Sequence, residues 1–78
     1  STTLKFSLPE SSPVSLNIYD VSGRLVRTLL DGQVIEAGRR EKRWDGLDNS
    51  GRQVSAGVYF AKMSAGEFVD VRRMALVK

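Results

Sequence analysis

The feature that most limits how this chain can fold is a series of short runs in which apolar and polar residues alternate. In residues 3–8, the side chains of Leu4, Phe6 and Leu8 fall on one side of an extended chain, and residues 14–19 repeat the pattern. Such runs are typical of half-buried strands, and the Gly, Pro, Asn and Asp clusters between them are typical of turns. Because no segment combines helical spacing with capping residues, the sequence predicts an all-β protein.

The alternating runs predict seven short strands. Val26 and Leu29 interrupt the alternation of the third run, which indicates a β-bulge. Asp31 and Gly32 predict a turn directly after that run. Short strands joined by tight turns favour an antiparallel β-sandwich, with a closed barrel as the alternative. The expected strands are residues 3–8, 14–19, 24–30, 33–35, 39–44, 58–63 and 67–77.

The length of the chain sets the size of its core. Seventy-eight residues can close one small hydrophobic core but not two, so residues 1–78 are expected to form a single domain. Trp44 brings the largest apolar side chain, and Tyr59 can pack its ring inside while its hydroxyl bonds to the backbone. The predicted core consists of Phe6, Leu16, Ile18, Val26, Leu29, Trp44, Tyr59 and Met63.

Aspartate and glycine mark the predicted turns. An aspartate carboxylate can accept hydrogen bonds from backbone amides just ahead of it, and glycine can adopt the positive φ that many tight turns need. Residues 45–51 carry the strongest turn signal in the chain. The expected turn residues are Asp20, Gly23, Asp45, Gly46, Asp48, Gly51 and Gly57.

Composition excludes several classes of chemistry. The chain has no cysteine and no histidine, which excludes disulfides, thiolate metal sites and the Ser-His-Asp triad. Twelve Lys and Arg against nine Asp and Glu give a net charge of +3, which is mild for a nucleic-acid-binding surface. Glu41 interrupts the basic run at residues 39–43, so we interpret that run as the solvated face of a strand. We expect no enzymatic activity, no cofactor and no nucleic-acid partner.

Two further observations concern the setting of the chain. No apolar run approaches the roughly 20 residues of a membrane-spanning helix, so the chain is not expected to span a membrane. The sequence opens at Ser1 without a methionine or a signal peptide, so we expect a processed product or a piece of a longer protein.

Two binding functions compete with purely structural interpretations. Asp45, Asp48 and Asn49 cluster oxygen ligands as a calcium loop would, but they do not match EF-hand spacing, and a self-capped turn is favoured. Exposed aromatic rings could stack on sugars, but Trp44 and Tyr59 are expected in the core. Tyr19 and Phe60 are the rings expected to face outward.

Four segments together resemble a known family. Residues 5–9, 18–26, 44–51 and 56–60 read KFSLP, IYDVSGRLV, WDGLDNSG and AGVYF. Their order and spacing resemble the immunoglobulin-like domain of the flagellar hook-capping protein, and more closely the type A C-terminal sorting domains of the type IX secretion system. The resemblance implies an Ig-like, fibronectin type III-like antiparallel sandwich. Lys42 stands where the family is usually apolar, and the family's upstream aromatic-proline-asparagine segment does not occur in this chain.

The resemblance implies a non-catalytic module of an exported bacterial protein, extracellular or on the cell surface. As a sorting and attachment domain it would contact the secretion machinery, above all through residues 71–78. As a self-assembling subunit of a filament or flagellar-cap-like scaffold, it would pair through its edge strands with copies of itself or with neighbouring subunits. The first strand would then pair either within its own domain or with a neighbour. A carbohydrate-binding accessory domain is the third alternative. The candidate recognition or edge residues are Thr2, Leu4, Phe6, Val71, Arg72, Arg73, Met74, Leu76 and Lys78.

Overall fold

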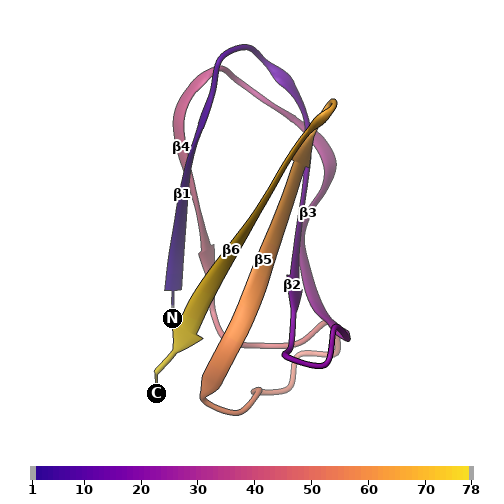
Figure 1. Ribbon diagram of the computed structural model, residues 1–78, viewed down its shortest axis with the longest axis vertical. Helices are drawn as coiled ribbons and strands as arrows, with labels where there is room; N and C mark the ends of the chain where they lie inside the picture. The colour runs from indigo at the N-terminus through magenta and orange to yellow at the C-terminus, as the bar shows by residue number, and fades with distance from the viewer. Residues whose placement is uncertain (1, 78) are drawn as a thin grey trace.

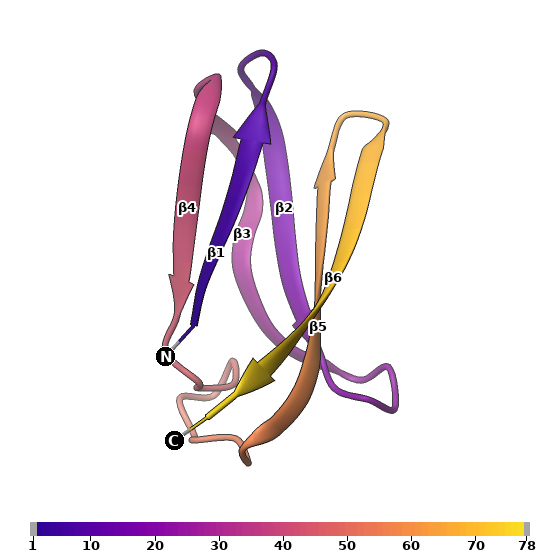
Figure 2. The same cartoon turned by 60° about the vertical axis from the view of Figure 1, so that its left-hand side comes forward.

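Two antiparallel sheets face each other in the computed structural model of this chain, which describes residues 2–77 (Figures 1 and 2). One sheet pairs β1 with β4, and the other has the order β3-β2-β5-β6. The body measures 35 × 21 × 20 Å. The predicted all-β antiparallel sandwich is confirmed, with six strands in the described residues in place of seven. The strands are β1 (Thr2–Leu8), β2 (Ser12–Tyr19), β3 (Leu25–Ile35), β4 (Gly38–Trp44), β5 (Gly57–Ala65) and β6 (Phe68–Leu76).

The turn predicted at Asp31 and Gly32 is wrong, and the strand expected at residues 33–35 belongs to β3. Val14 pairs with Gln33 and the next residue of β2 pairs with Asp31, so Gly32 is an extra residue with φ of +76°. A bulge and a tight turn both use a residue with positive φ, so they share the same sequence signature. Here the glycine bends the strand without reversing it.

The bulge predicted at Val26 and Leu29 is confirmed as two separate register shifts. Leu29 is the extra residue between the pairs that join Leu16 to Leu30 and Asn17 to Thr28. Val26 is the extra residue between the pairs that join Ile18 to Arg27 and Tyr19 to Leu25. Both side chains are half-buried and pack against the core. The broken alternation therefore indicated real irregularities in β3.

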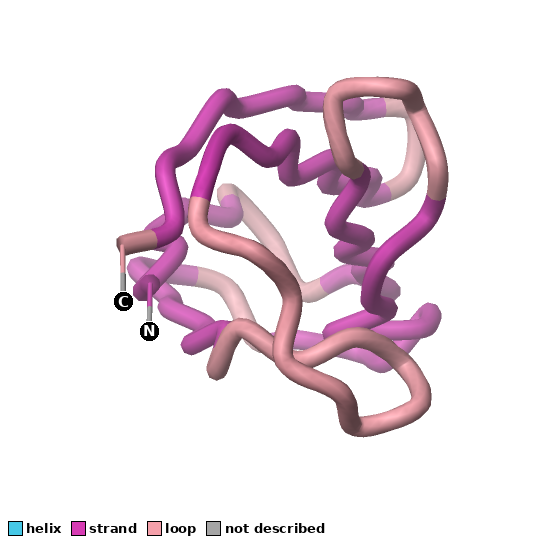
Figure 3. The backbone as a smooth tube through the Cα atoms, turned by 90° about the horizontal axis from the view of Figure 1, so that it is seen from below, coloured by secondary structure: helices cyan, strands magenta, loops and turns pink. Residues whose placement is uncertain are grey.

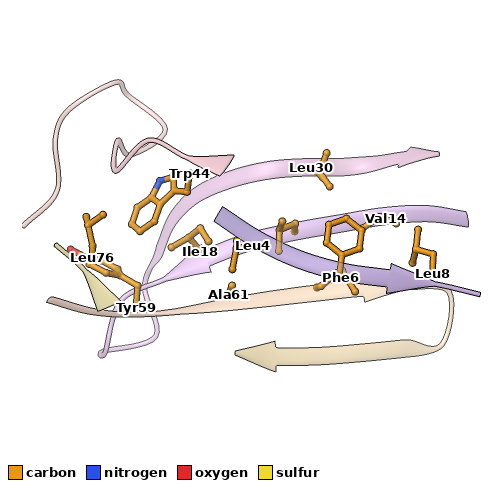
Figure 4. Packing of buried hydrophobic residues seen from close by; sticks show 12 residues of the cluster. Leu4, Phe6, Leu8, Val14, Ile18, Leu30, Trp44, Tyr59, Ala61 and Leu76 are labelled. Atoms are coloured by element: carbon orange, nitrogen blue, oxygen red, sulfur yellow. The ribbon is translucent and has the colours of Figure 1, made fainter. Parts of the chain in front are cut away.

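The core lies between the two sheets (Figure 4). Alternate residues of β1, β2 and β5 fill it, and β3, β4 and β6 each add one buried side chain, namely Leu30, Trp44 and Leu76. Trp44 is completely buried, and its ring meets that of Tyr59 edge-to-face, with ring centroids 5.1 Å apart. Edge-to-face packing is a favoured geometry for aromatic pairs. Of the predicted core, Phe6, Leu16, Ile18, Trp44, Tyr59 and Met63 are buried, whereas Val26 and Leu29 lie at the margin.

The first strand pairs within its own chain, which decides between the two pairings left open by the sequence. β1 runs antiparallel to β4, from Thr2 opposite Trp44 to Leu8 opposite Gly38. Leu4 and Phe6, considered as contacts to a neighbour, are buried in the core of this chain. Their apolar side chains need a covered surface, and β2 and β5 supply it across the sandwich. Only Thr2 of that set is half-buried.

Candidate interaction surfaces

One end of the molecule is built from two turns with the same sequence pattern, Asp-x-Ser-Gly-Arg (Figure 3). In the first turn, Oδ1 of Asp20 accepts hydrogen bonds from the Ser22 amide (2.9 Å), the Ser22 hydroxyl (2.6 Å) and the Arg24 amide (3.0 Å). The amide of Gly23 donates to the Asp20 carbonyl. Bonds to the charged form, led by the Ser22 hydroxyl, lower the pKa of Asp20.

The second turn repeats this arrangement at Asp48. Its Oδ1 accepts from the Ser50 amide (2.9 Å), the Ser50 hydroxyl (2.8 Å) and the Arg52 amide (3.0 Å), and the Gly51 amide donates to the Asp48 carbonyl. The Arg52 amide is the largest cause of the lowered pKa of Asp48, followed by the Ser50 hydroxyl. In each turn, the aspartate carboxylate thus accepts hydrogen bonds from the residues of its own turn.

The loop of residues 45–56 lies against the outer edge of β3. The Asn49 amide donates to the Val26 carbonyl (3.0 Å), and the Thr28 amide donates to Asn49 Oδ1 (2.9 Å). These bonds fall on the bulged part of the strand, where β3 has no strand neighbour on that side. The loop therefore occupies backbone groups that an edge strand would otherwise offer to another chain.

The base of the same loop is tied to the core through Leu47. Its carbonyl accepts from Trp44 Nε1 (3.0 Å) and from Arg27 Nη1 (3.1 Å). Arg27 also bonds Oδ1 of Asp45 at 3.2 Å. Gly46, with φ of +79°, packs so closely that an added Cβ would lie 3.4 Å from the side chain of Leu76. A buried indole and an arginine thus fix the loop that covers β3.

Each of the three residues considered for a calcium loop accepts hydrogen bonds from the protein through its Oδ1 atom. Asp48 Oδ1 serves its own turn, Asn49 Oδ1 serves Thr28, and Asp45 Oδ1 accepts from the Leu47 amide at 3.1 Å. Within residues 2–77, no three Asp, Glu, His or Cys side chains gather as a metal site. The arrangement is that of a self-capped loop.

The aromatic residues divide between core and surface. Trp44 and Tyr59 are buried, and the Tyr59 hydroxyl donates to the Ser55 carbonyl at 2.6 Å, just before Gly57 opens β5. Tyr19 lies directly opposite Phe60, and both are half-buried. The four rings therefore form no shared platform, because two of them are needed inside.

The basic run of β4 lies beside Lys5, the charged residue of β1. Lys5 is opposite Glu41, and the exposed Arg39 and Arg43 lie on the same outward side. The guanidinium of Arg40 turns back to its own strand entry, where it donates to the Glu36 and Ala37 carbonyls. The predicted solvated strand face therefore consists of Arg39, Glu41 and Arg43, whereas Arg40 and Lys42 lie on the other side of β4.

Lys42 stands at a position that is usually apolar in the family. It pairs with Leu4 and is half-buried, on the same side of β4 as Trp44. Its long aliphatic stem suits such a margin, where the ammonium group can still reach water.

The C-terminal recognition segment is divided by the pleat of β6. Val71, Arg72 and Arg73 are exposed. Leu76 is buried and Met74 packs against the core. Lys78 lies outside the described residues. Within residues 71–77, the surface available to a partner is therefore Val71 to Arg73 together with Ala75 and Val77, whereas Met74 and Leu76 face the core.

Sequence reasoning missed two features of this surface. The Asp-x-Ser-Gly-Arg pattern occurs twice in the sequence, but the turn signals of each copy alone do not show that the two turns share one geometry. Arg72 bonds Asp70 on its own strand at 3.0 Å and also donates to the Lys5 carbonyl of β1. That contact spans 67 residues of sequence, and no local pattern could have indicated it.

Within residues 2–77, no helix is long and apolar enough to cross a membrane.

Comparison with known proteins agrees with this architecture. A crystal structure of FlgD from P. aeruginosa matches with a TM-score of 0.67 and 32% sequence identity. The match covers 96% of this chain and 60% of that one, so this chain spans less than two thirds of that FlgD. No curated protein matches. A model of the FlgD Ig-like domain matches residues 1–67, and this chain therefore belongs to the FlgD Ig-like domain family.

Proposed function

We propose that this chain is a non-catalytic structural module that joins a larger assembly, as a flagellar-cap-like scaffold or extracellular filament subunit does, through its sheet edges. Membership of the FlgD Ig-like domain family carries the proposal. The resemblance to the flagellar hook-capping protein supports contact with neighbouring subunits and a position outside the cell.

The chemistry of the surface supports the same proposal. The carboxylates of Asp20 and Asp48 hold their own turns, and the side chains of Asp45 and Asn49 hold the long loop. These four side chains thus maintain the shape of the molecule. Strand edges and sheet faces remain as its means of interaction.

Cross-linking in the producing cell tests this proposal. A short amine-reactive cross-linker acts on lysines, and Lys5 and Lys62 are exposed. We expect the chain in covalent products larger than itself, because neighbouring subunits would lie within reach. Migration solely at the size of the uncross-linked protein would overturn the proposal.

A second candidate function is sorting by the type IX secretion system. Its support is that Val71, Arg72 and Arg73 are exposed on the last strand of the domain, as a recognised terminal strand would be. The test fuses the whole domain to a reporter in a host with that system. Export that depends on the domain would support sorting, and retention inside the cell would exclude it.

A further inference from the structure

β6 is the regular free edge of the four-stranded sheet (Figure 2). It stays in step with β5 from Gly57 opposite Leu76 to Ala65 opposite Phe68, without a register shift. By contrast, β3 is bulged three times along β2. A regular, unpaired edge is a template for another strand.

The hairpin fixes which backbone groups of β6 are free. Ala65 and Phe68 flank a two-residue turn, and residues in that position exchange hydrogen bonds across the hairpin. Every second residue from Phe68 onward therefore directs its backbone groups to β5. The intervening residues Val69, Val71 and Arg73 direct their N–H and C=O groups to the open edge.

Resting on the proposed function, we infer that β6 pairs antiparallel with β6 of a second copy, about a two-fold axis at Val71. In an antiparallel pair, two residues that lie opposite each other either both direct their backbone groups to the partner strand or both direct them away. A residue of β6 can therefore face only itself or a residue an even number of positions away in the second copy. The two-fold axis must then pass through a residue. With Val71 on the axis, Asp70 lies opposite Arg72 of the second copy, and this favourable pair occurs twice. Val69 lies opposite Arg73 of the second copy.

The neighbouring registers are less favourable. An axis at Asp70 places two aspartates opposite each other, and an axis at Arg72 or Arg73 places two arginines opposite each other. Like charges directly opposite in a sheet are destabilising. An axis at Val69 leaves Asp70 opposite Phe68, without an ion pair. Among the axes at residues 69–73, the charges of β6 therefore favour Val71.

Apolar surface supports the same axis. Val71 and Val69 are 56% and 54% exposed on the outer side of the sheet. In the inferred register, the two Val71 side chains meet at the axis, where each covers the other. Burial of exposed valine favours association.

Cysteine cross-linking tests the register directly, because the chain has no native cysteine. In the inferred pair, the Cα atoms of the two residues 71 lie about 5.5 Å apart, which is within reach of a disulfide. Val69→Cys is the matched control, since it is equally exposed but would lie about 14 Å from its counterpart. We expect Val71→Cys to form a covalent dimer under mild oxidation at least tenfold faster than Val69→Cys. Equal rates would overturn the inference.

A charge exchange provides a second test. Asp70→Arg and Arg72→Asp each place like charges opposite one another in a pair of identical copies. We expect each variant alone to associate roughly tenfold more weakly, because two favourable pairs become repulsive. An equimolar mixture of the two variants, or the double variant, restores opposite charges and should restore association.

The two variants and the mixture are compared by sedimentation velocity. Failure of the mixture to associate more strongly than either variant would contradict the register. Large complexes in cells together with equal cysteine rates would exclude β6 pairing and leave the proposed function standing. Fast Val71→Cys cross-linking without any complex in cells would support β6 pairing and exclude the proposed function.

Discussion

β3 and β6 are the two edge strands of one sheet, and they differ in regularity and in what covers them. β3 breaks register with β2 three times, and the loop of residues 45–56 bonds to its outer side through Asn49. β6 follows β5 without a shift. The same four-stranded sheet is therefore closed on one side and open on the other.

The difference indicates which edge of the sheet is protected against the addition of another strand and which edge can accept one. Bulges and covering loops are devices that prevent strand addition. The family match includes β3 and its covering loop and ends at residue 67, directly before β6. The closed edge thus lies within the shared family pattern, whereas the open edge lies beyond the matched residues.

Trp44→Ala should give the largest effect, because Trp44 joins the core to the loop that covers β3. The indole is fully buried and donates to the Leu47 carbonyl. Its loss should lower the free energy of unfolding by about 3–5 kcal/mol, measured by urea denaturation followed by circular dichroism. Trp44→Phe keeps most of the ring and should cost clearly less. Equal losses for the two variants would contradict this account of the core.

Asn49→Ala should open the edge of β3 itself. It removes the acceptor of the Thr28 amide, which should cost about 1 kcal/mol. Hydrogen exchange of the Thr28 amide should become faster, because its bond to the loop is lost. Gln53→Ala is the control, since Gln53 is exposed on the same loop. If exchange at Thr28 is unchanged in Asn49→Ala, the loop does not guard this edge.

Local sequence pattern predicted the irregularities of β3 at Val26 and Leu29, but not the bulge at Gly32 or how the edge of β3 is covered. The alternation of β1 and β2 reports directly on burial, so Leu16 and Ile18 could be placed in the core. Gly32 could not be assigned, because positive φ serves bulges and turns alike. The bond from Thr28 to Asn49 and that from Arg72 to Lys5 join distant segments. Such contacts exist only once the sheets have packed, so they lie outside what local patterns can predict.

Acid should loosen the two equivalent turns, of which only the second belongs to the loop against β3. The pKa values of Asp20 and Asp48 are lowered in the folded protein. Their contribution to stability is therefore complete above their ordinary pKa and is lost as the pH falls through the lowered values. The free energy of unfolding should fall below about pH 4.

Asp48→Asn should make that acid-induced fall shallower. In addition, exchange at Thr28 should accelerate at acid pH before exchange in β6 does. Asp20→Asn is the matched control, because it shares the turn geometry but lies in the turn between β2 and β3, outside the loop of residues 45–56. If both variants change the Thr28 amide equally, the second turn has no special role at this edge.

Val71→Glu and Val34→Glu should have the smallest effects on stability and should compare the two edges most directly. Both valines are exposed, Val34 on β3 and Val71 on β6, so each change should alter the free energy of unfolding by no more than about 0.5 kcal/mol. The carboxylate introduced by Val71→Glu would lie beside Lys62 on the neighbouring strand, yet it would face its own counterpart across the inferred axis. Sedimentation should therefore show weaker association for Val71→Glu and unchanged association for Val34→Glu. Because β3 is already bulged at Gly32, two residues before Val34, a charge at Val34 removes no regular pairing edge. Equal weakening by both variants would show that the two edges do not differ.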